Sequence, residues 1–331
     1  MLMNEIPVKQ DDGYITILYP HYTEAVPKGT VLILHGMAEH HARYLEFTAF
    51  LNHCGYDVFL YDHRGHGTDK KLEELGIFSA KDGDVKVTTD AIHLIHFIRK
   101  NCRNKNIFLY AHSMGSLIAR NVIQHEDSIA GLILCGTAHL APAAIKLGQL
   151  ISSAIRSAKG HDYVSQFMHK LMFPPKAFDS VCERTKFDWL TRNQNIVGQY
   201  MHDGFCGYTC SIGLYNDVIK IMKNITSPHM VRRTRKDLPI YIISGKNDPV
   251  GNFGNDIYHC VSMFQKLNFT AIECTIYAES RHELLNELNQ KEVMLGIMKW
   301  LNKTTDTTAS SDVSDENPSE EASSTDSVAT E

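Results

Sequence analysis

One segment of the chain places a serine where nucleophilic attack on an ester or amide is possible. In NIFLYAHSMGSLIARNVI, Ser113 lies between a strand-like apolar run and a helix-like run. A serine at such a strand–turn–helix junction keeps its hydroxyl exposed, as in the G-x-S-x-G elbow. Ala111 replaces the first glycine of that pattern and Gly115 keeps the second, so the departure is the smallest possible. The segment predicts Ser113 as a nucleophile.

A serine nucleophile needs a base, and the base needs an acid behind it. Asp248 follows the apolar run PIYIISG and His282 follows the run FTAIECTIY. The order serine, acid, histidine is one in which such triads occur. Asp248 would fix the His282 tautomer and stabilise the imidazolium that forms during attack. Glu279 and Glu283, which flank His282, are interpreted as solvated charges, and His112 is expected to point away from the site.

Backbone N–H groups are expected to stabilise the negative charge that develops on the carbonyl oxygen. One would come from Met114, directly after the nucleophile, and the other from Met37, in the segment HGMAEH. The eight cysteines are scattered, and only Cys206 and Cys210 lie close together. Without a second pair or a histidine cluster, neither a metal site nor a disulfide framework is predicted. We expect no cofactor, and chelators are not expected to inhibit.

The elements that must position these residues form a repeating pattern. Apolar, β-branched runs alternate with amphipathic stretches such as residues 85–103, which indicates a mostly parallel sheet covered by helices on both faces. The predicted strands are residues 14–19, 30–36, 56–62, 106–113, 130–136, 239–245 and 269–277. The alternation stops between Gly136 and Pro239. We therefore predict an α/β core from residues 1–137 and 231–302, with residues 138–230 inserted as a helical cap.

The first part of this cap has helical periodicity from Ala143 to Ala158, with apolar residues on one side. If that side covers the nucleophile, it would line an acyl channel with the following residues: Leu147, Leu150, Ile151 and Ile155. Helical periodicity alone supports equally well a face that only packs on the core.

Charge and composition exclude several classes of protein. Residues 303–331 hold one lysine and eight acidic residues, so the net charge of −5 hides a value of +2 for the other 302 residues. This tail is predicted to be disordered, because it has too few apolar residues to offset its ordering entropy. No apolar run approaches the length of about 18–20 residues that a membrane span needs. Nor does MLMNEIPVKQ resemble a signal peptide. A cytoplasmic protein with at most peripheral membrane contact is expected, and nucleic-acid binding is not.

Several motifs together resemble one family of serine hydrolases. HGMAEHHARY is similar to the HG-x-x-EH-x-x-RY signature of the monoacylglycerol lipase and lysophospholipase group, which carries the serine aminopeptidase-type domain. YDHRGHG, AHSMG, SGKNDPVG and SRHELLNE are similar to further elements of that group, and FDWLTRN and DGFCGY resemble the cap of its bacterial lysophospholipase-like members. The resemblance covers about residues 15–301. It implies the α/β-hydrolase fold and hydrolysis of a monoacyl lipid ester.

The leading hypothesis is therefore a carboxylic ester hydrolase that acts on a lysophospholipid or a monoacylglycerol. An aminopeptidase on the same fold would need acidic groups in the cap to bind the substrate's amine. Residues 138–230 hold ten basic and six acidic residues, a net charge of +4, which argues against that alternative. A small-ester carboxylesterase is a further alternative. A non-catalytic binding protein is the most remote alternative, because the triad residues are intact.

Overall fold

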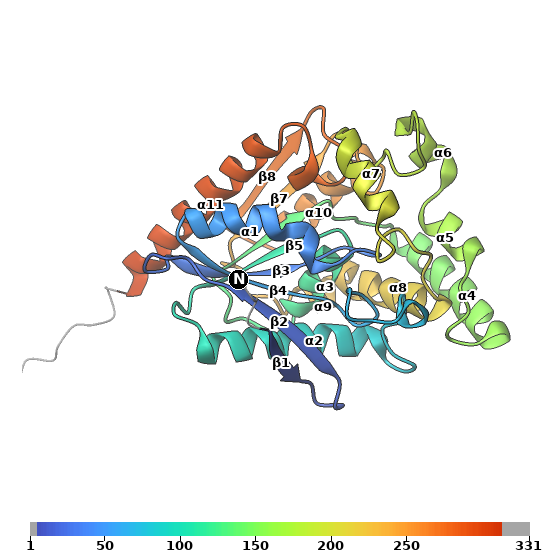
Figure 1. The fold of residues 1–331 in the computed structure, drawn as a ribbon, viewed down its shortest axis with the longest axis horizontal. Helices are drawn as coiled ribbons and strands as arrows, with labels where there is room; N and C mark the ends of the chain where they lie inside the picture. Colours follow the sequence, from blue (N-terminus) through green and yellow to red (C-terminus); the bar gives the residue numbers. More distant parts are fainter. Residues whose placement is uncertain (1–4, 313–331) are drawn as a thin grey trace, which may run out of the picture.

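A single eight-stranded sheet runs through the centre of the molecule (Figure 1). The computed structural model describes residues 5–312, with side chains described as far as Asp306. The strand order is β1-β2-β4-β3-β5-β6-β7-β8, and every pair from β4 through β8 is parallel. Only β1 and β2 run antiparallel to their neighbours. The prediction of a mostly parallel sheet is confirmed.

Each predicted strand is present. Their bounds are β2 Ile15–His21, β3 Gly29–Leu34, β4 Tyr56–Tyr61, β5 Ile107–His112, β6 Gly131–Cys135, β7 Ile240–Gly245 and β8 Ile272–Tyr277. Strands β3 to β7 are buried along their whole length, which is why they read as continuous apolar runs. Strand β1, Ile6–Lys9, was not predicted, because it is short and buries only Val8.

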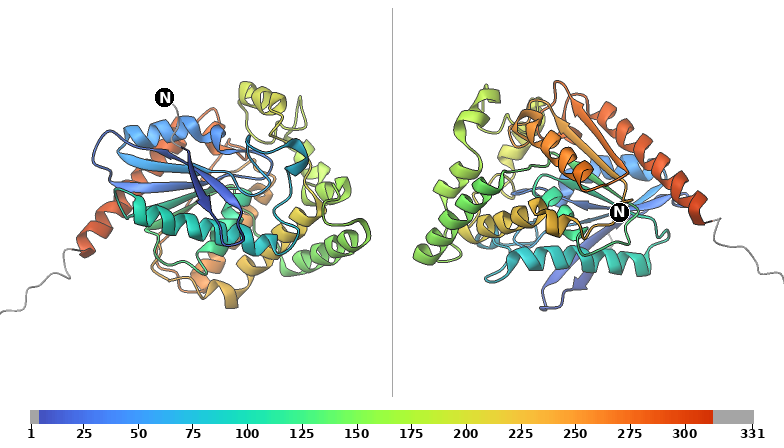
Figure 2. Two further views of the ribbon diagram at one scale, coloured as in Figure 1. Left: turned by 60° about the horizontal axis from the view of Figure 1, so that its bottom comes forward. Right: turned by 180° about the vertical axis from the view of Figure 1, so that it is seen from behind.

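Both faces of the sheet are covered, and the two faces form separate cores. On one side Val31 and Ile33 pack with α1 (Leu45–His53) and α11 (Gln290–Asp312). On the other side Leu32 and Leu34 pack with α2 (Gly83–Asn101), α3 (Met114–Val122) and α10 (Asn255–Lys266). Figure 2 shows these helix layers from two further directions. Because side chains alternate along a strand, one apolar run supplies both cores.

The segment between β6 and β7 is helical, as predicted. Its helices are α4 Pro142–Lys159, α5 Gln166–Met172, α6 Pro175–Phe178, α7 Gln194–His202, α8 Ile212–Thr226 and α9 Pro228–Val231. Helices α4 to α7 gather beyond one edge of the core, as Figure 1 shows. Helix α8 instead packs against α2 and α3 and is buried on nearly every side. Helix α8 is therefore part of the packed core, although it lies within the inserted residues 138–230.

The prediction that disorder begins at residue 303 is wrong for the first part of that tail. Helix α11 continues to Asp312, and Thr304 is 7% exposed. Thr304 donates through its hydroxyl to the Trp300 carbonyl, and the hydroxyls of Thr305 and Tyr56 are 3.1 Å apart. The threonine-rich, acidic composition does not predict this helical extension. It forms because one turn, at Thr304 and Thr305, packs against the core. Residues 313–331 lie outside the described part of the chain. Among residues 5–312, no helix combines the length and the apolarity needed to cross a membrane.

Candidate active site

Ser113 lies at the sharp turn between β5 and α3, with φ at 51°. A positive φ is unusual for a residue with a side chain and is a mark of strained functional turns. The turn is tight because α3 begins against the end of β3: a Cβ on Gly115 would lie 2.3 Å from the Leu34 carbonyl oxygen. Ala111, the departure from the G-x-S-x-G pattern, points into the core and leaves this contact unchanged.

The loops after β7 and β8 bring Asp248 and His282 together. His282 Nδ1 and Asp248 Oδ2 are 2.9 Å apart, and the two residues are 2% and 0% exposed. Asp248 Oδ1 accepts from the Val250 N–H over 2.8 Å, which fixes the carboxylate. Burial alone would lower the pKa of His282, but the charge and hydrogen bond of Asp248 outweigh it and raise that pKa above 6.5. Ser113 and His282 line the same cavity.

Two backbone N–H groups beside Ser113 are available to a substrate oxygen. Met37 follows β3 by three residues, and Met114 is the first residue of α3. Within residues 5–312, neither N–H has a hydrogen-bond acceptor in the protein. Met37, Ser113 and Met114 all line one cavity. Unpaired backbone donors beside the nucleophile are what an oxyanion hole requires.

A buried ion network ties the Met37 loop to the His282 loop. The Arg43 guanidinium donates to both carboxylate oxygens of Glu283 over 2.6 Å each, and to Glu39 Oε2 over 2.6 Å. Glu39 in turn accepts from the Gly36 N–H and from the Tyr44 hydroxyl. Burial would raise the pKa of Glu39, but Arg43 outweighs it and holds that pKa at about 2. The interpretation of Glu283 as a solvated charge is wrong, because it is 5% exposed and paired.

Two aromatic rings flank His282, and neither contact was predicted from the sequence. The His112 ring lies 4.7 Å from the His282 ring, so the expectation that His112 points away from the site is wrong. His112 pairs in register with Cys135, whose side chain belongs to the face covered by α11, and the His282 loop closes over that face. The Trp189 ring, from the inserted segment, lies 5.1 Å from His282. Sequence distance hid both contacts.

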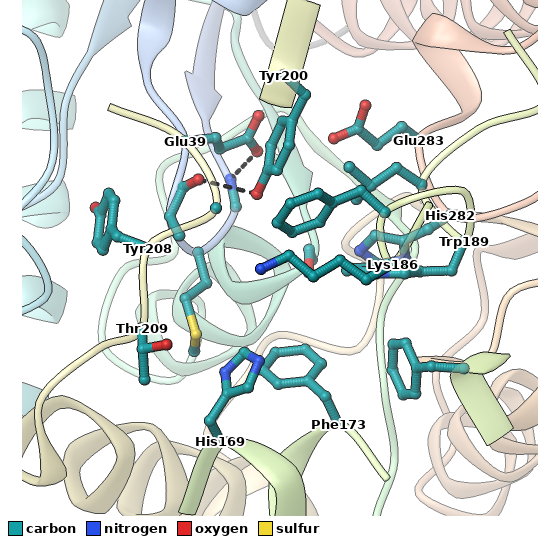
Figure 3. A pocket seen from close by; sticks show the side chains of 18 of the residues that line it. Glu39, His169, Phe173, Lys186, Trp189, Tyr200, Tyr208, Thr209, His282 and Glu283 are labelled. Atoms are coloured by element: carbon teal, nitrogen blue, oxygen red, sulfur yellow. Dashed lines mark hydrogen bonds between the residues drawn. The ribbon is translucent and has the colours of Figure 1, made fainter. Parts of the chain in front are cut away.

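Two cavities of different character meet at Ser113. One, of about 420 Å³, is lined mostly by apolar side chains of α4, α5, α8 and the loop after β7. The other, of about 320 Å³, has a mixed lining that includes Lys170, Lys186 and His169 (Figure 3). Met37, Ser113, Phe173 and Phe178 border both. A molecule bound at Ser113 would thus contact an apolar cavity on one side and a polar cavity on the other.

The predicted acyl-channel residues divide into two sets. Leu147 lines the apolar cavity, together with Ile145 of the same helix. Leu150 is 69% exposed and lines neither cavity, and Ile151 and Ile155 pack towards the core instead. The reason is that α4 packs against α8 through the face that carries Ser152. Asn216 of α8 donates to the Ser152 hydroxyl over 2.7 Å, which turns Leu150 outward.

Three atoms of types that bind metals also approach one another near the site. His40, Asp203 and Cys206 place one such atom each within 4.8 Å of the others. The hydrogen bond of 2.8 Å between His40 Nε2 and Asp203 Oδ2 accounts for this closeness as a link between two loops.

Comparisons with known proteins agree with the fold. A monoglyceride lipase homolog of Monkeypox virus is 25% identical over 301 residues, which cover 88% of this chain and 95% of the relative. The monoglyceride lipase of Saccharomyces cerevisiae is 24% identical over 308 residues, which cover 85% and 87%. A thermostable carboxyl esterase from Bacillus coagulans, solved with glycerol, has a TM-score of 0.83 at 27% identity over 92% of this chain and 99% of that one.

The resemblance read from the sequence motifs is thereby confirmed at the level of family. Residues 25–289 match the family described as serine aminopeptidase, S33. This match covers most of the chain and includes Ser113, Asp248 and His282. The chain belongs to the serine aminopeptidase S33 family and has the α/β-hydrolase fold.

Proposed function

We propose that this chain hydrolyses the ester bond of a lipid with one acyl chain. The observation that carries the proposal is that Ser113 borders an apolar cavity of about 420 Å³ and a polar cavity of about 320 Å³ at once. An ester of a fatty acid with a polar alcohol has that same division at its carbonyl carbon. The monoglyceride lipases among the relatives carry names that agree with such a substrate.

The proposed reaction has two steps. Ser113 Oγ attacks the ester carbonyl while His282 Nε2 takes its proton, and the Met37 and Met114 N–H groups hydrogen-bond to the resulting oxyanion. The tetrahedral intermediate then collapses: His282 returns the proton to the alcohol, which leaves, and the acyl group stays on Ser113. Water, activated by His282, attacks the acyl-enzyme and releases the fatty acid. Asp248 keeps Nδ1 of His282 protonated, so that Nε2 is the basic nitrogen.

The apolar cavity is the proposed acyl site. Its walls include Leu117, Ile145, Val218, Ile219 and Met222, of which all but Leu117 come from the inserted residues. Each buried methylene contributes about 0.8 kcal/mol, so filling the cavity with six more carbons would add up to about 5 kcal/mol. The proposed specificity for long acyl chains follows from this free energy of methylene burial.

The polar cavity is the proposed site for the alcohol part of the lipid. Lys186 extends across it, and Lys170 and Gln166 lie at its wall (Figure 3 labels Lys186). Among the described side chains, no carboxylate lies within ion-pair distance of either lysine. These groups can hydrogen-bond to glycerol hydroxyls and, with charge assistance, to a phosphodiester, which are the polar parts of a monoacylglycerol and a lysophospholipid.

The entrance to the apolar cavity offers a surface for peripheral contact with lipid. Leu147 and Leu171 line the cavity and are 58% and 42% exposed, and Leu150 and Phe167 beside them on the same helices are 69% and 62% exposed. Exposed large apolar side chains on two neighbouring helices are unusual on a monomer and are typical of interaction surfaces. We propose that this rim rests on a lipid surface while the substrate enters.

A substrate panel tests the proposal. Wild-type protein and Ser113→Ala would be assayed with p-nitrophenyl acetate and octanoate, a monoacylglycerol, a lysophospholipid and an aminoacyl amide. We expect kcat/KM to rise by about two to three orders of magnitude from acetate to octanoate, with cleavage of at least one of the two lipids. Equal rates on acetate and octanoate would overturn the lipid-ester proposal. A preference for the aminoacyl amide would favour an aminopeptidase.

A further inference from the structure

The loop that carries Met37 is held at both ends, by a side chain of its own at the start and by the inserted segment at the end. At its start, the Gly36 N–H donates to the Glu39 carboxylate. At its end, the Ala38 carbonyl oxygen accepts two hydrogen bonds from the inserted segment: one from the Tyr200 hydroxyl over 3.1 Å and one from the Gly207 N–H over 2.9 Å. Figure 3 shows the Tyr200 hydroxyl directed at this loop. The Met37 N–H lies between these two anchored points.

The second anchor holds a backbone conformation that would not persist by itself. Ala38 has φ at 53°, in the left-handed region that residues with a Cβ seldom adopt. Such a conformation is strained and survives only where the surroundings impose it. At Ala38 the surroundings are the two donors of the inserted segment. Without these two hydrogen bonds, a move of Ala38 to negative φ would lower the free energy of the loop, and the peptide groups on either side of Ala38 would rotate.

The donors themselves are firmly placed. Tyr200 is 6% exposed; its ring lies 4.8 Å from the Arg43 guanidinium carbon and 5.1 Å from the Phe187 ring. Gly207 has φ at 67°, and a Cβ there would come within 2.9 Å of the Tyr200 ring. The hydrogen bond that His40 Nε2 donates to Asp203 Oδ2 adds a third link between the same two segments. The Met37 loop and the inserted segment are therefore joined by a buried contact.

We infer that the inserted segment, through the Tyr200 hydroxyl, sets the direction of the Met37 N–H and so completes the oxyanion hole. Tyr200 is then a positioning residue. Its effect is on the rate of the chemical step, because a donor that is correctly aimed only in the transition state lowers the barrier without tightening substrate binding. Movement of the inserted segment away from the core would weaken catalysis even for esters too small to fill the apolar cavity. The inference rests on the proposed function.

Tyr200→Phe tests the inference, because it removes the hydroxyl and keeps the ring between Arg43 and Phe187. With p-nitrophenyl acetate we expect kcat to fall about tenfold, below the loss of 10²–10³ found when an oxyanion donor is removed outright, while KM changes less than twofold. A phenyl trifluoromethyl ketone, whose adduct with serine carries the negative charge on the oxygen that enters the hole, should bind more weakly by the same factor as kcat falls.

Tyr241→Phe is the matched control. Tyr241 of β7 is 6% exposed and lines neither cavity, and its hydroxyl lies 2.9 Å from the Thr275 hydroxyl, away from the Met37 loop. This variant should keep at least half of the wild-type kcat and ketone affinity. Both variants would be assayed well below their melting temperatures, so that a structural loss is excluded.

The possible outcomes separate the two proposals. If the wild type neither hydrolyses the acetate ester nor binds the ketone, the proposed function fails. If the wild type does both and Tyr200→Phe keeps its full kcat and ketone affinity, the inference about Tyr200 is overturned and the proposed function stands. Equal losses in Tyr200→Phe and Tyr241→Phe would also overturn it, because loss of any buried tyrosine hydroxyl would then have the same effect.

Discussion

Arg43 and Glu283 are 240 positions apart in the chain, yet the guanidinium of one donates to both carboxylate oxygens of the other over 2.6 Å. Their side chains are 11% and 5% exposed. Through this pair, the loop after β3 is joined to the loop that carries His282. A buried ion pair adds little stability compared with well-packed apolar residues, but loss of one partner leaves the other charge uncompensated.

The first prediction concerns the stability that depends on this pair. Arg43→Met leaves the carboxylates of Glu39 and Glu283 buried without their shared cation, so we expect a loss of about 3–5 kcal/mol in the free energy of unfolding. Denaturation in urea, followed by circular dichroism, measures this loss. Glu279→Gln is the control: Glu279 is exposed, and its substitution should change stability by less than about 0.5 kcal/mol. Equal effects of the two substitutions would contradict the buried network.

The second prediction concerns the acid behind His282. Asp248→Asn leaves the shape of the site unchanged but favours the wrong histidine tautomer, which costs on the order of 10⁴ in kcat in other triads. We expect a loss of that size with p-nitrophenyl esters. Glu279→Gln should keep nearly the full kcat, since Glu279 lies on the surface. A larger loss at Glu279 than at Asp248 would assign the acid to Glu279.

The third prediction concerns pH. His282 must be neutral to accept the Ser113 proton, and its pKa is raised because Asp248 outweighs the effect of burial. The rate should therefore rise with pH through a midpoint above 6.5. Burial, and next the nearby His282, hold the pKa of His112 at about 4, so His112 stays neutral over this range. The measurement is kcat/KM from pH 5 to 9. A midpoint below 6.5 would contradict the assignment of His282 as base.

The fourth prediction compares two leucines of α4. Leu147 lines the apolar cavity, whereas Leu150 does not, although both are exposed on their outer sides. Leu147→Gln should reduce the ratio of kcat/KM for octanoate to that for acetate, because a polar group then meets the acyl chain. Leu150→Gln should leave the ratio within about twofold of wild type. If Leu150→Gln has the larger effect on this ratio, the acyl chain follows a path outside the apolar cavity.

The sheet could be predicted from the sequence because its central strands are buried on both faces. A short apolar run such as residues 30–36 is typical of a strand that is buried on both faces of a parallel sheet. The residues that follow such strands meet at one edge of the sheet. This is why Asp248 and His282 could be named together. Strand β1 escaped prediction because an edge strand of four residues with one buried side chain leaves almost no pattern.

Contacts between distant segments could not be predicted in the same way. Helical periodicity in α4 shows which side chains share a side, but only the packing of Ser152 on α8 decides that Leu150 faces outward. Likewise, a glutamate beside His282 gives no local sign that an arginine from the other end of the chain lies against it. The clearest available sign was the resemblance of HGMAEHHARY to a family signature, which joins Glu39, Arg43 and Tyr44 in one motif.

Covalent labelling of Ser113 tests the central claim most directly. A fluorophosphonate probe reacts with a serine only when a base activates it, and residues 106–120 form a tryptic peptide with two serines, Ser113 and Ser116. Fragmentation of the labelled peptide should place one probe on Ser113, since Ser116 is buried and bonds to the Ser113 carbonyl. Ser113→Ala should lose both the label and esterase turnover while its melting curve stays close to wild type. Label or turnover that survives in Ser113→Ala would show that another residue is the nucleophile.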